Sequence, residues 1–105
     1  MSQAHPDSGR VEAAFSQRYR EAREKFLQAA HQAGLSVQSH QHPLQGRDGE
    51  DLAMDVVRDG PADARAVLLL SSACHGVEGY CGSGVQTALL GDAGFRAALA
   101  PYWIR

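Results

Sequence analysis

The sequence feature that most restricts the fold is an apolar run over residues 66–70, in which no polar residue alternates with the apolar ones. Strands covered on both faces in the middle of an α/β sheet have this composition, whereas half-exposed strands alternate. A glycine-rich turn and a helical pattern follow the run. We therefore predict an α/β fold in which residues 66–70 form a buried strand.

The sequence before this run predicts one long helix and a hairpin. Over residues 15–33 the apolar side chains recur at the spacing of one helical face, and Gly34 is a typical C-terminal stop. Residues 35–39 and 52–56 alternate between apolar and polar, as half-exposed strands do, and we expect Pro43 to end the first of them. A turn cluster between the two strands completes the hairpin.

The sequence after the run predicts short helices. Ser83 and Gln86 have the spacing of a capping box, which would start a helix that ends at Gly91. A second short helix is expected over residues 95–100, and residues 101–104 have the composition of the start of another strand. The whole chain then contains about three strands and two to three helices.

Length and charge exclude several classes of protein. At 105 residues the chain is at most one small domain, with residues 1–10 as a loose leader and residues 11–105 as the folded part. Its formal net charge of −2 lacks the basic footprint of a protein that binds nucleic acid or an anionic membrane surface. The start has no signal-peptide pattern, and no apolar run approaches the length of a membrane helix. We therefore expect a cytoplasmic protein without a nucleic-acid or membrane partner.

The two cysteines, Cys74 and Cys81, are too few for the disulfide framework of a small secreted domain. Both flank the glycine-rich turn. Because free cysteines are among the most buried residue types, we expect them to be small buried side chains in a reducing compartment.

His75 and Glu78 follow the predicted strand, at the edge of an α/β sheet where ligands usually bind. An imidazole nitrogen and a carboxylate oxygen are good zinc ligands, and a spacing of three residues across a tight turn lets both reach one ion. A catalytic zinc usually has three protein ligands, so this pair is half of a site. No other histidine is an obvious third ligand, and we expect His40 and His42 to be solvated.

Three alternatives compete with a metal site in this segment. In the first, His75 and Glu78 only form hydrogen bonds to the backbone of a glycine-rich turn, and the residues alone favour neither interpretation. In the second, the glycines around Gly82 cradle a phosphate, although Thr87 stands where a third glycine would be required. Thiol catalysis by Cys74 or Cys81 ranks third, because adjacent residues such as Cys74 and His75 point apart on an extended chain.

Four stretches carry a resemblance to a known family: FSQRYREAREKFLQAA, HPLQGRDGEDLAMDV, AVLLLSS and, most specifically, HGVEG followed by GSGVQ. Over roughly residues 15–104 the chain resembles a bacterial family, domain of unknown function 2817, placed among the zinc carboxypeptidases near the succinylglutamate desuccinylase and aspartoacylase group. The HxxE pair of that superfamily binds zinc, which implies that His75 and Glu78 are ligands. The third zinc histidine, the substrate-binding arginines and the general-base glutamate come from later sequence in such enzymes, so no other functional residue transfers.

The resemblance implies that residues 11–105 are the truncated N-terminal portion of a zinc carboxypeptidase-like domain with a mixed sheet. The complete protein would be a zinc-dependent hydrolase that cleaves an amide bond in a peptide or an acyl-amino acid, of the metallocarboxypeptidase or acyl-amino-acid hydrolase type. The chain alone would be inactive. The alternative hypothesis is an inert truncated product or a non-catalytic interaction module, and no feature of the sequence specifies a protein partner.

Overall fold

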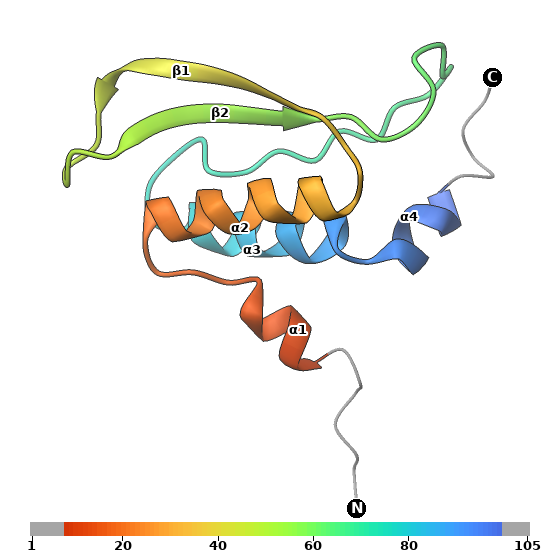
Figure 1. Cartoon of the computed structure of the whole chain (residues 1–105), viewed down its shortest axis with the longest axis horizontal. Coiled ribbons are helices and arrows are strands. Elements are labelled where there is room, and N and C mark those ends of the chain that lie inside the picture. The colour runs from red at the N-terminus through yellow and green to blue at the C-terminus, as the bar shows by residue number, and fades with distance from the viewer. Residues whose placement is uncertain (1–7, 100–105) are drawn as a thin grey trace, which may run out of the picture.

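The computed structural model describes residues 8–99 and shows a mixed α/β chain, as predicted. In Figure 1 the β-hairpin forms one layer, and α2 and α3 pack against each other beneath it. No helix within residues 8–99 combines the length and the apolar character needed to cross a bilayer. In chain order the elements are α1 (Ser8–Ala13), α2 (Tyr19–Gln32), β1 (Val37–Gln45), β2 (Asp51–Val57), α3 (Gly79–Leu90) and α4 (Ala93–Leu99).

The long N-terminal helix ends where the sequence predicted. Gly34 has φ +74°, its N–H donates to the carbonyl of His31 at 3.0 Å, and the N–H of Leu35 donates to the carbonyl of Ala30 at 2.9 Å. These two bonds form a Schellman motif, which needs a left-handed residue at the glycine position. The helix begins later than predicted, at Tyr19. Residues 8–10 of the expected leader belong to α1, and residues 1–7 lie outside the described part of the chain.

The hairpin is confirmed, but Pro43 does not end its first strand. β1 continues to Gln45, and between Gln41 and Gln45 the antiparallel register shifts: these residues pair with Ala53 and Asp51. The four-residue advance from Gln41 to Gln45 on β1 thus lies opposite a two-residue advance on β2, which makes a β-bulge. Proline is tolerated in such a bulge, because the missing N–H is not required by the ladder. The prediction that Pro43 terminates the strand was therefore wrong.

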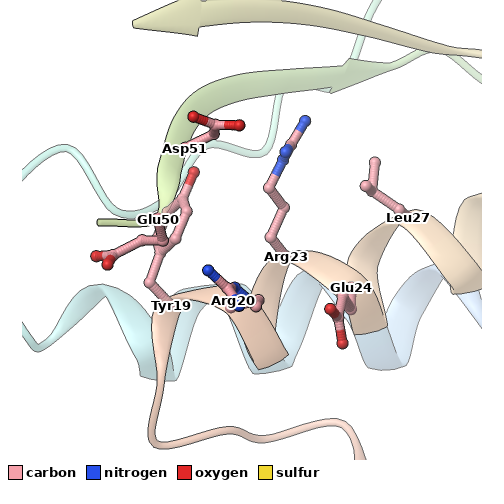
Figure 2. A pocket seen from close by; sticks show the side chains of 7 residues that line it. All are labelled: Tyr19, Arg20, Arg23, Glu24, Leu27, Glu50 and Asp51. Atoms are coloured by element: carbon pink, nitrogen blue, oxygen red, sulfur yellow. The ribbon is translucent and has the colours of Figure 1, made fainter. Parts of the chain in front are cut away.

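Helix α2 is fixed to β2 by two sets of polar contacts. The Tyr19 hydroxyl accepts a hydrogen bond from the N–H of Ala53 at 2.8 Å and donates to the carbonyl of the same residue at 3.1 Å. Arg23 donates to the two carboxylate oxygens of Asp55 at 2.9 and 3.2 Å. Figure 2 shows the side chains of Tyr19 and Arg23 pointing from α2 toward β2. A bidentate pair of this kind fixes orientation as well as distance.

The predicted capping box is wrong, although the end of the helix is confirmed. α3 starts at Gly79, four residues before Ser83, and its last residue, Leu90, is followed by Gly91 as the C-cap. The side chain of Gln86 bonds to residues outside the helix, so it is not available for capping. α4 begins close to the prediction, after Asp92, whose carboxylate oxygen accepts a hydrogen bond from the N–H of Phe95 at 2.9 Å.

Residues 66–70 do not form the predicted buried strand. Within residues 8–99 the sheet contains only β1 and β2, and residues 66–70 are assigned to neither a helix nor a strand. Their apolar side chains are exposed, with Val67 at 75% and Leu69 at 82%. A strand requires backbone partners and covering faces, and no described element provides them. The predicted strand over residues 101–104 lies outside the described residues.

The core is small and made of small side chains. Its buried apolar residues are Ala14, Ala22, Ala29 and Ala30, and no large side chain among the described residues is fully buried. Several large apolar side chains are instead exposed, among them Val67, Leu69 and Val77.

Candidate metal half-site

His75 and Glu78 lie in the turn that leads into α3. The first three N–H groups of this helix donate to carbonyls three residues earlier, starting at Gly76, over 3.0 to 3.1 Å. Glu78 already has helical dihedral angles, φ −59° and ψ −20°, and its side chain makes no capping bond. The turn is tight, and the carboxylate is left free for another partner.

The structure brings the two predicted ligands to one hollow. This hollow has a volume of about 320 Å³, and both His75 and Glu78 contribute to its wall. A methyl group added at Gly76 would lie 3.2 Å from Oε2 of Glu78, so the carboxylate folds back over the turn that carries the imidazole. The full lining consists of Ser71, Ser72, Ala73, Cys74, His75, Glu78, Gly79 and Gly82.

Both side chains are available as ligands. His75 and Glu78 are exposed, and within residues 8–99 no hydrogen bond or ion pair engages the side chain of either residue. The alternative in which they serve only as hydrogen-bond partners of the turn backbone therefore has no support in the described contacts. An imidazole and a carboxylate with free lone pairs are suited to bind a divalent cation.

No described residue completes the site. Among residues 8–99, no three His, Cys, Asp or Glu side chains lie close enough together to hold a metal ion. His31 on α2 and both His40 and His42 on β1 are exposed, and Nδ1 of His42 accepts a hydrogen bond from the N–H of Leu44 at 3.0 Å. His5 lies outside the described residues. Among the described residues, the hollow therefore contains one imidazole and one carboxylate.

The backbone just before His75 is strained. Ala73 has φ +64°, and it is the only non-glycine residue of the described chain with a positive φ. This left-handed conformation is unfavourable for a residue with a Cβ atom, by roughly 1–2 kcal/mol. Close packing accompanies the strain, because a Cβ at Gly79 would lie 2.7 Å from Cα of Ala73. Strain that the surroundings impose is concentrated at functional sites.

The phosphate-cradle interpretation of the glycines is wrong. Gly82 and Gly84 lie inside α3, where their N–H groups belong to the helix. A methyl group at Gly82 would be 2.5 Å from Cβ of Ser72, and one at Gly84 would overlap the ring of Phe15. These glycines allow other segments to approach the helix closely, and they do not form a loop with free donors.

The cysteines are exposed free thiols, so the expectation that they are buried was wrong. For Cys74 the physical reason is that no described element covers the segment before the turn. Cys74 contributes to the hollow beside His75, but within residues 8–99 no hydrogen bond joins the two side chains. Thiol catalysis gains no support from this geometry.

A second hollow, of about 260 Å³, lies between α2 and the start of β2 (Figure 2). Its charged groups are of both signs, and Arg23 is already bound to Asp55. With neither a histidine nor a cysteine in its wall, it has little metal-binding or nucleophilic chemistry. Nothing in the sequence indicated this hollow, which is lined by Tyr19, Arg20, Arg23, Glu24, Leu27, Glu50 and Asp51.

Comparison with known proteins identifies a family whose function is not known. Residues 15–101, most of the chain, match the family described as Protein of unknown function (DUF2817). No curated protein and no solved structure matches the sequence. The matched region contains the hairpin, α2, α3 and the turn with His75 and Glu78. The chain therefore belongs to the DUF2817 family of proteins of unknown function.

Proposed function

We propose that this chain is the N-terminal part of a zinc-dependent hydrolase that cleaves an amide bond, with His75 and Glu78 as two of the zinc ligands. One observation carries the proposal: the two side chains line the same hollow, and no described contact occupies their donor atoms. Imidazole nitrogen and carboxylate oxygen bind zinc at about 2.0 to 2.2 Å. The substrate class, a peptide or an acyl-amino acid, follows from the resemblance to zinc carboxypeptidases.

The two donors fit zinc in chemical type, but a catalytic zinc usually has three protein ligands and an open position. The third ligand and a general base would come from sequence outside this chain. When bound, the metal would lower the pKa of a water molecule to about 7 and polarise the scissile carbonyl. The role of this chain is to hold an imidazole and a carboxylate on a tight turn at the start of α3.

The exposed apolar segment supports the same proposal. Val67 and Leu69 lie among the most exposed large apolar side chains of the described chain, directly before the turn that carries His75. Contiguous apolar surface of this kind usually lies in an interface or under another part of the fold. In a larger hydrolase domain, neighbouring strands would cover residues 66–70 and add ligands beside the hollow.

Replacing His75 by alanine is expected to abolish stoichiometric zinc binding in the protein expressed from the complete gene, because one of two adjacent ligands is lost. Zinc content after dialysis and amidase activity on acyl-amino acids and peptides are the measurements. His31→Ala is the matched control, since His31 is an exposed histidine on α2 outside the hollow. Equal zinc occupancy in wild type and His75→Ala would remove the proposal.

The alternative proposal is that the 105-residue chain is an inert product or a non-catalytic interaction module. On this alternative the chain would hold no metal by itself, since residues 8–99 include no group of three His, Cys, Asp or Glu that could bind one. Zinc titration of the isolated chain separates the two proposals, since a three-ligand site binds far more tightly than two residues on a turn. Tight one-to-one binding with turnover by the isolated chain would exclude the inert product.

A further inference from the structure

We propose that Gln86 is a positioning residue, which holds the segment before His75 against α3 and thereby sets where the imidazole stands. The expected effect of Gln86 on zinc affinity rests on the proposed function, whereas its expected effect on the backbone order of residues 70–75 does not. Gln86 lies two turns into α3, and its side chain reaches back to the segment that precedes the turn.

The side-chain nitrogen and oxygen of Gln86 both form hydrogen bonds. Nε2 donates a hydrogen bond to the carbonyl of Leu70 at 2.7 Å, and Oε1 accepts one from Oγ of Ser72 at 2.9 Å. Among the described residues, these are the only hydrogen bonds that reach residues 66–75. A segment without helix or strand bonds is thus tied to the fold through one side chain.

The same face of α3 determines how closely the segment approaches. Positions 79, 82 and 86 are spaced by three and four residues, so they share one helical face. The glycine at 79 lies against Ala73 and the glycine at 82 against Ser72, at distances that leave no space for a Cβ. The segment therefore runs along this face, with the amide of Gln86 as its polar anchor.

The anchor fixes the register of the segment on the helix. Slipping by one residue would separate Nε2 from the Leu70 carbonyl and Oε1 from the Ser72 hydroxyl, and would lose both bonds together. Only Ala73 and Cys74 separate Ser72 from His75, and Ala73 is held in the left-handed region. Because Ser72 is held in place, the short stretch from Ser72 to His75 starts from a fixed point, and this helps to place the imidazole in the hollow that Glu78 also lines.

The test replaces Gln86 by methionine, which has a similar length but cannot form either bond. Gln45→Met is the matched control, because the Gln45 amide makes one long 3.4 Å contact on the exposed end of β1. Backbone order parameters of residues 72–75 are measured by NMR in the metal-free 105-residue chain. We expect them to fall in Gln86→Met toward the flexible range, below about 0.6, and to stay unchanged in Gln45→Met.

Zinc affinity is then measured by competition titration for the same substitutions in the protein expressed from the complete gene. Loss of a group that orients a ligand typically weakens metal binding about tenfold or more, and this loss is expected for Gln86→Met. Order parameters that fall while the zinc affinity stays within twofold of the control would overturn the positioning role. If His75→Ala leaves zinc affinity unchanged, the proposed function fails, and the order parameters still decide whether Gln86 holds the segment.

A glutamate at this position tests whether the hydrogen bond donated to Leu70 is what orders the segment. An ionised carboxylate cannot donate to the Leu70 carbonyl, but a protonated one can donate there and accept from Ser72. In Gln86→Glu the order of residues 72–75 should be lost at pH 7 and regained as the introduced carboxyl is protonated. If Gln86→Met does not fold, Ser72→Ala removes one of the two bonds, and the same measurements are made on that variant. Unchanged backbone order of residues 72–75 in a folded variant would overturn the proposal.

Discussion

Replacing Asp55 by alanine is expected to lower the free energy of unfolding by about 2–3 kcal/mol. The Asp55 carboxylate accepts hydrogen bonds from Arg23 at 2.9 and 3.2 Å and from the Ser39 hydroxyl at 2.6 Å, and its side chain is only 7% exposed. Its removal leaves the guanidinium of Arg23, 28% exposed, facing the sheet without a partner. Urea unfolding at pH 7, followed by circular dichroism, measures the loss.

A matched substitution separates this effect from the general loss of a surface charge. Asp48 pairs with Arg47 at 3.5 Å, but the side chains are 76% and 93% exposed, respectively. Such exposed pairs contribute little, so Asp48→Ala should change stability by less than about 0.5 kcal/mol. Similar losses in both variants would show that the Asp55 contacts do not hold the helix on the hairpin.

The same carboxyl makes stability depend on pH in a defined direction. Burial by itself raises the pKa of Asp55, but the hydrogen bonds from Arg23 and Ser39, with the charge of Arg23, outweigh it and hold that pKa below its ordinary value. A carboxyl with a lowered pKa in the folded state contributes stability above its unfolded pKa, and this contribution is lost as pH falls through the folded pKa. The stability difference between wild type and Asp55→Asn should stay constant from pH 5 to pH 8 and shrink below about pH 4. A difference that persists undiminished at lower pH, where the chain is still folded, would contradict this assignment.

Replacing Gly79 by alanine should destabilise the chain by about 1–3 kcal/mol, because the added methyl group has no space. Its Cβ would lie 2.7 Å from Cα of Ala73, which is backbone and cannot rotate away as a side chain could. The higher helix propensity of alanine, about 1 kcal/mol, opposes this effect but is too small to reverse it. Thermal and urea unfolding of the wild type and Gly79→Ala measure the net change in stability.

Gly9 is the control for helix propensity. It lies in α1, and a methyl group added there meets no other atom within 4 Å. Gly9→Ala should therefore be neutral or stabilising, by up to about 1 kcal/mol. If Gly79→Ala were also stabilising, residues 72 and 73 would not lie against α3, and the close approach described for this helix face would be incorrect.

The parts of the fold that could be predicted are those that depend on neighbouring residues in the sequence. Gly34 ends α2 in a left-handed conformation, with bonds from Gly34 to His31 and from Leu35 to Ala30. Gly91 follows α3 as a right-handed C-cap whose N–H donates to the carbonyl of Thr87. The failed predictions depend on distant partners. Pro43 is tolerated because the hairpin has a bulge, and residues 66–70 lack the neighbouring strands that their composition requires.

The candidate site divides in the same way. His75 and Glu78, three residues apart on a tight turn, both line one hollow, and their role as zinc ligands stays a prediction. The contacts of Gln86 could not be predicted, because its partners lie 14 and 16 residues away and its spacing from Ser83 imitates a cap. The recurrence of positions 79, 82 and 86 on one helical face was the available signal.

The alanine core has a consequence for calorimetry. The heat capacity change of unfolding is dominated by newly exposed apolar surface, at about +0.45 cal/mol/K per Å². Among the described residues, the buried apolar ones are four alanines, and the segment with Val67 and Leu69 is already in contact with water before unfolding. The heat capacity increment should therefore fall below the roughly 1.2–1.5 kcal/mol/K usual for a chain of about 100 residues. Its stability curve would be flat, with a broad thermal transition.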